Sequence, residues 1–174
     1  MKAYRTPPQT QLNTECVTCT PPEHDGEIIA FTDLWKVILH PDQSGLGSCL
    51  VAPLRHVPRL CDQTPEESIG FFELVRELEP ALEHAFGATL INFSCLRNWA
   101  YRLHDPDPPF KNGQPNPHVH WHVLTRYARP VTFEGVTFTD EAFGEPFEPK
   151  GESAKGIRRE IIERIQGELE LEYV

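Results

Sequence analysis

The clearest hydrophobic pattern in this chain is a strict alternation over residues 117–124, Pro-His-Val-His-Trp-His-Val-Leu. A period of two residues predicts a β-strand, because successive side chains of a strand point to opposite faces of its sheet. His118, His120 and His122 then share one face, and the apolar residues between them share the face that is buried. Three adjacent imidazoles titrate near neutral pH and can serve as nucleophile, acid, base or metal ligand. The pattern therefore predicts an active site or a metal site on the polar face.

Other short apolar runs predict the rest of a sheet. Residues 27–31 and 34–40 are separated by Thr-Asp, which favours a hairpin. Residues 48–52 and 89–96 are two further apolar runs, and residues 133–138 have the pattern of a small hairpin. We therefore expect at least five strands, counting the strand that carries the histidines.

Two stretches predict helices. Thr64, Pro65 and Glu67 have the spacing of a capped helix start, and Gly87 should end that helix, with a kink at Pro80. Apolar residues at intervals of three and four predict its buried stripe: Ile69, Phe72, Val75, Leu78, Leu82 and Phe86. A second helix is expected over residues 152–168, with Ile157, Ile161 and Ile165 on one face.

Strands in runs with one intervening helix predict an α+β fold with a mostly antiparallel sheet. The length of 174 residues fits one domain, which we place at residues 16–174 after a flexible arm at residues 1–15. Residues 99–117 are rich in proline and predict a long loop, and long loops in compact domains are usually functional or disordered.

Composition limits the partners of the domain. A formal net charge of −10 disfavours non-specific binding to a nucleic-acid backbone, which needs a basic surface. No apolar run approaches the roughly 18 residues that a membrane span needs, and residues 1–15 lack the apolar core of a secretion signal. We therefore expect a cytoplasmic protein without a nucleic-acid partner, and the charge does not exclude a small anionic ligand held by local donors.

Structural disulfides between the five cysteines are disfavoured, because such bonds are rare inside cells. Cys16 and Cys19 form a Cys-x-x-Cys pair, which by itself fits an ordinary turn, a redox pair or half of a metal site. The histidine strand has two interpretations besides catalysis: a zinc site made of all three imidazoles, or simply a polar strand face.

The sequence resembles the histidine triad (HIT) family. Residues 118–124 match its motif His-φ-His-φ-His-φ-φ, in which φ is an apolar residue. Residues 47–56, Gly-Ser-Cys-Leu-Val-Ala-Pro-Leu-Arg-His, resemble the family's stretch from Gly-His to Pro-Lys-x-His, and residues 60–67 resemble its helix start. The likeness covers about residues 16–127. Details at five positions look most like the diadenosine polyphosphate hydrolase branch: Asn92, Asn98, Trp121, Arg126 and Tyr127.

The resemblance implies a HIT-like fold with a five-stranded sheet, a capped helix and a C-terminal helix. It also implies an activity, cleavage of dinucleoside polyphosphates such as diadenosine tetraphosphate at the α-phosphate. His120 would be the nucleophile that forms a nucleotidyl-histidine intermediate, and a backbone carbonyl should accept the proton of its other ring nitrogen. His122 would bond a phosphate oxygen. Asn98, Gly113 and Gln114 are the expected phosphate donors.

The same resemblance implies a structural zinc ion, since related proteins bind one through the histidines that correspond to His56 and His118. Cys16 and Cys19 would complete a tetrahedral Cys₂His₂ site. No cofactor is expected to be required for catalysis. HIT proteins usually join their sheets in pairs, so a homodimer is also implied.

Three positions depart from the family pattern. Ser48 stands where a fourth histidine is common, so the group there can bond a substrate but carries no charge. His40 stands where the family has an acidic or amide side chain that contacts the ribose. Pro115 replaces a Ser or Thr that donates to the phosphate. The alternatives are therefore a nucleoside phosphoramidate hydrolase, a nucleotidyl transferase, and a non-catalytic nucleotide-binding sensor.

Overall fold

The computed structural model describes residues 27–151 and 154–169, together with Ala3, Cys16, Cys19 and Leu171. The arm predicted at residues 1–15 lies outside this part of the chain, Ala3 excepted. The described strands are β1 (Ile28–Phe31), β2 (Trp35–Leu39), β3 (Cys49–Pro53), β4 (Leu90–Ser94), β5 (Trp121–Arg126), β6 (Val131–Phe133) and β7 (Val136–Phe138). The helices are α1 (Pro65–Phe86), α2 (Arg158–Glu168) and two short 3₁₀ helices, η1 (Leu60–Asp62) and η2 (Asn98–Tyr101).

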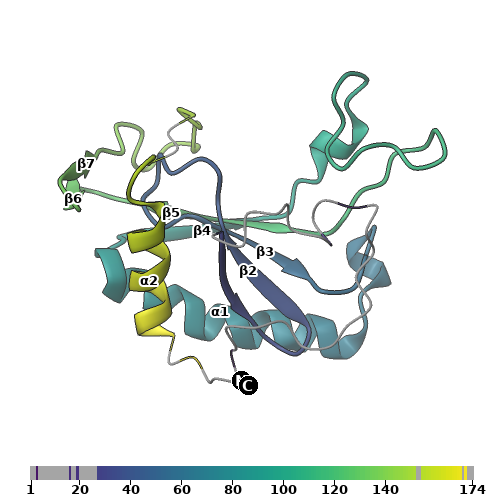
Figure 1. Ribbon diagram of the computed structural model, residues 1–174, viewed down its shortest axis with the longest axis horizontal. Helices are drawn as coiled ribbons and strands as arrows, with labels where there is room; N and C mark the ends of the chain where they lie inside the picture. Colours follow the sequence, from purple (N-terminus) through teal and green to yellow (C-terminus); the bar gives the residue numbers. More distant parts are fainter. Residues whose placement is uncertain are drawn as a thin grey trace.

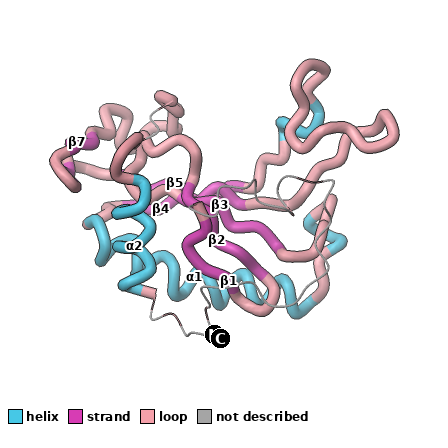
Figure 2. Tube along the Cα trace, in the orientation of Figure 1, coloured by secondary structure: helices cyan, strands magenta, loops and turns pink. Residues whose placement is uncertain are grey.

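Five of these strands form one antiparallel sheet in the order β1-β2-β3-β5-β4, and β6 and β7 form a separate hairpin. Figure 1 shows α1 running beneath the sheet, while long loops project on the other side. The strands occupy the centre of the molecule between those helices and loops (Figure 2). The predicted α+β class and the five-stranded antiparallel sheet are confirmed.

The start and the end of α1 are those that the sequence predicts. The Thr64 hydroxyl accepts from the Glu67 amide, and the Glu67 carboxylate accepts from the Thr64 amide, which is a complete capping box. Gly87 ends the helix in the left-handed conformation, and its N–H donates to the carbonyl of Glu83. The helix runs through Pro80 without interruption.

The predicted buried stripe of α1 is wrong in its first half. Ile69 and Phe72 are 61% and 66% exposed, whereas Phe71 and Leu74 face the sheet. The reason is the neighbouring strand: Trp35 on β2 packs against Phe71 with ring centroids 5.3 Å apart, and it donates to the Glu67 carbonyl. This contact sets the rotation of the helix, and spacing alone could not choose between Phe71 and Phe72.

Helix α2 packs against α1 and β1 through Ile161 and Ile165, which are fully buried. The expected face is therefore confirmed, although the helix begins at Arg158 rather than at residue 152. Arg158 forms an ion pair with Glu27, just before β1, and also donates to the carbonyl of His40 at the end of β2. The helix thus supports the edge of the sheet near the histidines.

The predicted loop between β4 and β5 extends beyond the sheet and contains η2 and a tight turn over residues 111–114 (Figure 1). Several of its apolar side chains are exposed, including Trp99 and Leu103. Within the described ranges, no helix combines the length and apolar character that crossing a bilayer requires.

Candidate active site and metal centre

The three histidines of the alternating run lie at the start of β5 and just before it. Only His122 is inside the strand, while His118 and His120 belong to the extended segment that leads into it. Trp121 stacks on Phe71 of α1, with ring centroids 4.5 Å apart and an interplanar angle of 21°. Because neighbouring side chains alternate, His120 and His122 lie on the face of the sheet opposite to α1.

A backbone carbonyl fixes the orientation of the His120 ring. Its Nδ1 lies 2.9 Å from the backbone carbonyl oxygen of His118. That oxygen can only accept, so Nδ1 carries a proton, and the tautomer compatible with this bond has its lone pair on Nε2. The expected bond to a backbone carbonyl is confirmed. The ring is only partly buried, which leaves its Nε2 edge available to a reactant.

His122 stands beside His120 and is electrically neutral. Their rings meet edge to face with centroids 5.0 Å apart. Burial lowers the pKa of His122 to about 4, and the neighbouring His120 and His40 act in the same direction. At neutral pH the ring therefore donates or accepts a hydrogen bond without carrying charge.

His40 lies one residue beyond β2 and points at the triad. Its Nε2 is 3.2 Å from Nδ1 of His122, and the two ring centroids are 5.4 Å apart. Its Nδ1 lies against the backbone of Asp42, at 3.0 Å from the nitrogen and 2.9 Å from the oxygen. Both ring nitrogens are thus engaged within the protein, so neither is free for the ribose contact that the sequence predicts.

Four side chains gather into one cluster at the other end of the triad. The donor atoms of Cys16, Cys19, His56 and His118 all lie within 4.8 Å of one another. Nδ1 of His118 is 3.4 Å from the Cys16 sulfur and 3.2 Å from the Cys19 sulfur, and Nδ1 of His56 is 3.3 Å from the Cys19 sulfur. The structure brings together all four residues that were predicted as zinc ligands.

A backbone hydrogen bond positions the histidines of this cluster, and neighbouring groups favour the thiolate form of Cys16. The amide of Val119 donates to the carbonyl of Val57 at 2.7 Å, which places His56 and His118 side by side with ring centroids 4.9 Å apart. A hydrogen bond with Cys19 lowers the pKa of the Cys16 thiol well below its usual value, and His118 adds to the effect. A thiolate is the form that binds metal, so the donor set fits a divalent ion.

The orientation of the rings rules against a metal site made of the three triad histidines. His118 turns its Nδ1 to the cysteines and His120 turns its Nδ1 to a carbonyl, so their lone pairs do not converge. In the described part of the chain, the Cys₂His₂ set is the cluster that could hold a metal ion. The interpretation as an inert polar strand face also fails, because each imidazole has a specific partner.

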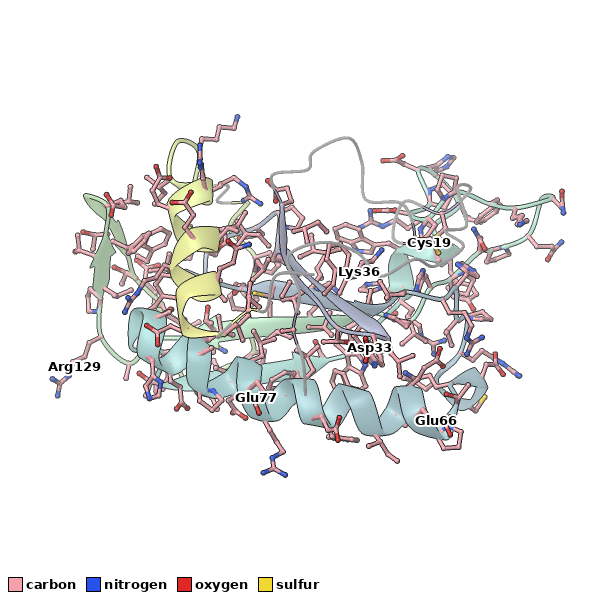
Figure 3. The ribbon with its side chains drawn as sticks, turned by 60° about the horizontal axis from the view of Figure 1, so that its bottom comes forward. Cys19, Asp33, Lys36, Glu66, Glu77 and Arg129 are labelled. Carbon is pink, nitrogen blue, oxygen red and sulfur yellow. The ribbon has the colours of Figure 1, made fainter. Side chains whose placement is uncertain are left out.

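Lys36 is a residue near the site that the sequence reasoning missed. It is 1% exposed and its ammonium donates to the backbone carbonyl of Cys19 at 3.1 Å (Figure 3). Burial lowers its pKa to about 8, although the cysteine thiolates favour the charged form. A lysine within the apolar run of β2 is the signal that would have identified it.

Ser48 is engaged inside the protein. The side chain is fully buried, and its hydroxyl lies 3.1 Å from the Thr125 hydroxyl and accepts from the Thr125 amide. Ser48 comes one residue before β3, and both of these partner atoms belong to Thr125 of the neighbouring strand β5. The contacts around Ser48 therefore do not support the substrate bond expected there.

The predicted phosphate donors lie on the long loop and remain predictions. Asn98 is exposed at the start of η2. Gly113 and Gln114 are exposed in the turn closed by paired backbone bonds between Lys111 and Gln114. Pro115 follows directly. Among the described residues, no hydrogen bond joins any of these positions to the histidines.

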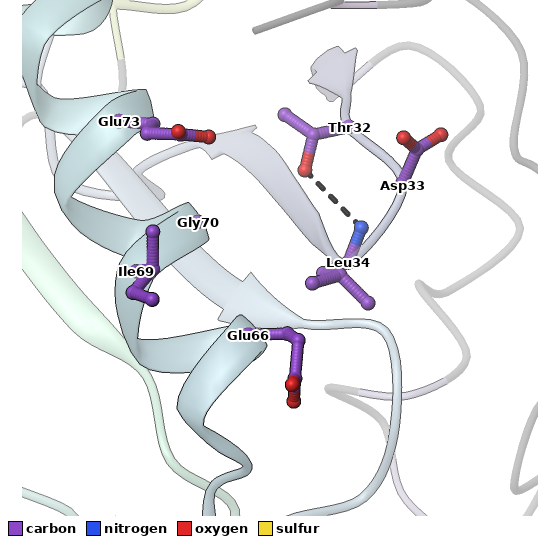
Figure 4. A pocket seen from close by; sticks show the side chains of 7 residues that line it. All are labelled: Thr32, Asp33, Leu34, Glu66, Ile69, Gly70 and Glu73. Atoms are coloured by element: carbon purple, nitrogen blue, oxygen red, sulfur yellow. Dashed lines mark hydrogen bonds between the residues drawn. The ribbon is translucent and has the colours of Figure 1, made fainter.

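A separate shallow pocket of about 280 Å³ lies between α1 and the turn from β1 to β2 (Figure 4). Its lining contains no histidine, and three of its side chains are carboxylates. The lining residues are Thr32, Asp33, Leu34, Glu66, Ile69, Gly70 and Glu73. Negative side chains repel a polyphosphate, so this pocket is not the nucleotide site.

Comparison with known proteins agrees with this geometry. The family model described as the HIT domain matches residues 21–129, which include His40, His56 and the whole triad. The chain belongs to the HIT family. Membership accounts for the shared face of the histidines and for the α+β fold that carries them.

One curated relative is the asymmetrical bis(5′-nucleosyl)-tetraphosphatase of Schizosaccharomyces pombe, which is 35% identical over 80 residues. The match covers 46% of this chain and 38% of that protein, so it spans well under half of the relative's length.

Solved structures show the same fold. A hypothetical histidine triad nucleotide-binding protein from Sulfolobus tokodaii has a TM-score of 0.60 at 18% identity, over 89% of this chain and 92% of that one. A zinc-bound histidine triad family protein from Mycobacterium smegmatis has a TM-score of 0.57 at 21% identity, over 88% and 92%.

Proposed function

We propose that this protein hydrolyses dinucleoside polyphosphates, such as diadenosine tetraphosphate, by attack of His120 on the α-phosphorus. The observation that carries the proposal is the bond from His120 Nδ1 to the His118 carbonyl, which leaves Nε2 as a neutral nucleophile. An anionic phosphorus centre favours attack by a neutral group. The tetraphosphatase named above supports the substrate class.

Two steps then follow. In the first, the Nε2 lone pair bonds to the α-phosphorus, and the bridging P–O bond breaks with its electron pair leaving on the departing nucleotide. In the second, water attacks the nucleotidyl-histidine, and the P–N bond breaks to return the lone pair to His120. His122, neutral beside it, donates to a phosphate oxygen and stabilises the charge that develops there.

The nucleophile is tested by replacing His120 with Ala. We expect hydrolysis of diadenosine tetraphosphate to fall by at least about 10³-fold, with nucleotide binding retained. His84→Ala is the matched control, because this exposed histidine lies on α1, on the opposite side of the sheet. Turnover by His120→Ala at the normal rate would exclude the proposed nucleophile.

Two further measurements separate the alternative activities. Hydrolysis in H₂¹⁸O should place the label on the nucleoside monophosphate, since water attacks the nucleotidyl group. An adenosine phosphoramidate that is cleaved faster than diadenosine tetraphosphate would instead indicate the phosphoramidate hydrolase. Transfer to added phosphate would indicate the transferase, and micromolar binding without turnover would indicate the sensor.

We also propose that Cys16, Cys19, His56 and His118 hold a structural zinc ion, in keeping with the zinc-bound relative from Mycobacterium smegmatis. Zinc bound there would neutralise the two thiolates and tie the segment around Cys16 and Cys19 to the sheet. Elemental analysis of the purified protein should find one zinc per chain.

The ligand variant Cys16→Ala should lose that zinc, while Cys61→Ala should keep it, because Cys61 is exposed and lies outside the cluster. Stoichiometric zinc that survives in Cys16→Ala would contradict the proposed ligand set.

Finally, we propose that the protein is a cytoplasmic homodimer in which two sheets join through β4. This strand is one of the two edges of the described sheet, and β1, the other edge, packs against α2. An edge strand has unpaired backbone groups that can bond to a second copy. Leu90, its first residue, is 43% exposed.

A further inference from the structure

The bond between His40 and His122 joins two neutral imidazoles at the centre of the proposed site. Their nitrogens are 3.2 Å apart, and the rings are inclined by 54°. In such a pair one nitrogen must donate and the other must accept. The position of the proton on His40 therefore decides its position on His122.

His40 itself is held firmly by the protein backbone. Its amide donates to the Ser48 carbonyl at 2.9 Å, and its own carbonyl accepts from Gln43 at 2.8 Å and from Arg158 at 3.2 Å. Residues from the β2–β3 connection and from α2 thus fix the ring in front of His122. A side chain positioned this way is suited to orient another group.

The Nδ1 atom of His40 meets both a donor and an acceptor, the N–H and the C=O of Asp42. When Nδ1 is bare it accepts from the Asp42 amide, and Nε2–H of His40 then donates to Nδ1 of His122. When Nδ1 is protonated it donates to the Asp42 carbonyl, and His40 Nε2 then accepts from His122.

Only the first arrangement suits a phosphate. With its Nδ1 accepting, His122 carries its proton on Nε2, and that N–H can donate to a phosphate oxygen. In the second arrangement a lone pair of His122 would face the negatively charged oxygens, which is unfavourable. An anionic substrate therefore selects the arrangement in which His40 donates.

We propose that His40 is a positioning residue that keeps the proton of His122 on Nε2 by donating from its own Nε2–H to Nδ1 of His122. In this arrangement the Asp42 amide donates to Nδ1 of His40, and the bound phosphate favours it over the alternative. The inference rests on the proposed function, in which His122 bonds the substrate phosphate, and it replaces the ribose contact expected at His40.

The direct test is the tautomer of His122, read by long-range ¹H–¹⁵N NMR on protein labelled in histidine and saturated with a nucleoside monophosphate. In the unaltered chain Nε2 should appear as the protonated nitrogen and Nδ1 as the bare one. His40→Gln should preserve this pattern, because its side-chain amide can present an N–H near the place of Nε2. His40→Leu should lose it, while circular dichroism shows that both variants are folded.

Kinetics provide the second readout. We expect kcat for His40→Leu to fall about 10- to 100-fold, with KM nearly unchanged and with partial recovery in His40→Gln. Removing the ribose hydroxyls from the substrate should slow the unaltered chain and the His40→Leu variant by the same factor, because the two effects are independent. If removing the ribose hydroxyls slows the unaltered chain but not the His40→Leu variant, then His40 contacts the ribose and the proposal is overturned.

The two readouts also separate this inference from the proposed function. If no nucleotide is hydrolysed but the His122 tautomer changes with His40→Leu, the catalytic proposal fails and the positioning role stands. If hydrolysis is normal and the tautomer is the same in all three proteins, the positioning role is wrong and the catalytic proposal stands.

Discussion

At the scale of single residues, environment gives three chemically identical histidines three different tasks. His118 directs its ring to two sulfurs, His120 is oriented by a carbonyl, and His122 is paired with a fourth imidazole. Alternation along the strand predicts that the rings share a face, but it says nothing about what each ring contacts. The division of tasks comes from segments far away in the sequence, such as residues 16–19 and 40–42.

The depressed pKa of His122 predicts how stability depends on pH. The folded-state pKa is about 4, below the ordinary value of 6.5, so the unfolded chain takes up a proton first as the pH falls. The contribution of His122 to stability is therefore complete above about pH 6.5 and is lost as the pH falls toward 4. Solvent screening reduces the effect because the ring is only partly buried. We therefore expect the free energy of unfolding to fall by about 1–3 kcal/mol.

The measurement is urea unfolding at pH 7.5 and 4.5, with chelator present throughout so that metal release does not contribute. The unaltered chain should lose more stability between these two values than His122→Gln, which cannot titrate. Equal losses in the two proteins would show that His122 is not held neutral by the fold.

At the scale of elements, one close approach links the β2–β3 connection to the end of α1. A Cβ added at Gly47 would lie 2.6 Å from the ring of Phe86, and the backbone there has a φ of +83°. Gly47→Ala should therefore destabilise the fold by steric overlap as well as by backbone strain.

Gly135 offers a matched comparison, because its φ is +76° and a Cβ there would meet nothing within 4 Å. We expect Gly47→Ala to cost about 1–3 kcal/mol more than Gly135→Ala in denaturant unfolding. Equal costs would mean that the Phe86 ring moves aside freely.

Features of the helices and strands that depend on local sequence signals were predicted, whereas features that depend on contacts between elements were not. Caps, turns and alternation are local signals, and they correctly predicted the ends of α1, the strands of the sheet and the buried face of α2. The rotation of α1 depends on Trp35 of a different element, so the exposed Ile69 and Phe72 were assigned to the core. The contacts of Ser48 and Lys36 could not be foreseen for the same reason, since their partners lie on other segments of the chain.

At the scale of the whole molecule, the open edge at β4 predicts the oligomeric state. Sedimentation equilibrium should give the mass of a dimer, and Leu90→Arg should shift it toward the monomer by placing charge at the proposed junction. Ile69→Arg is the control, because Ile69 is more exposed than Leu90 but lies on α1. A monomer in the unaltered chain would exclude the dimer.

His118 belongs to two sites at once, since its ring faces the cysteines and its carbonyl orients His120. His118 therefore connects the cysteine cluster directly to His120. The proposed zinc would therefore be bound by a residue whose carbonyl accepts from the proposed nucleophile. Removing that ion is expected to disturb the orientation of His120, and so to slow the proposed hydrolysis more than it weakens nucleotide binding.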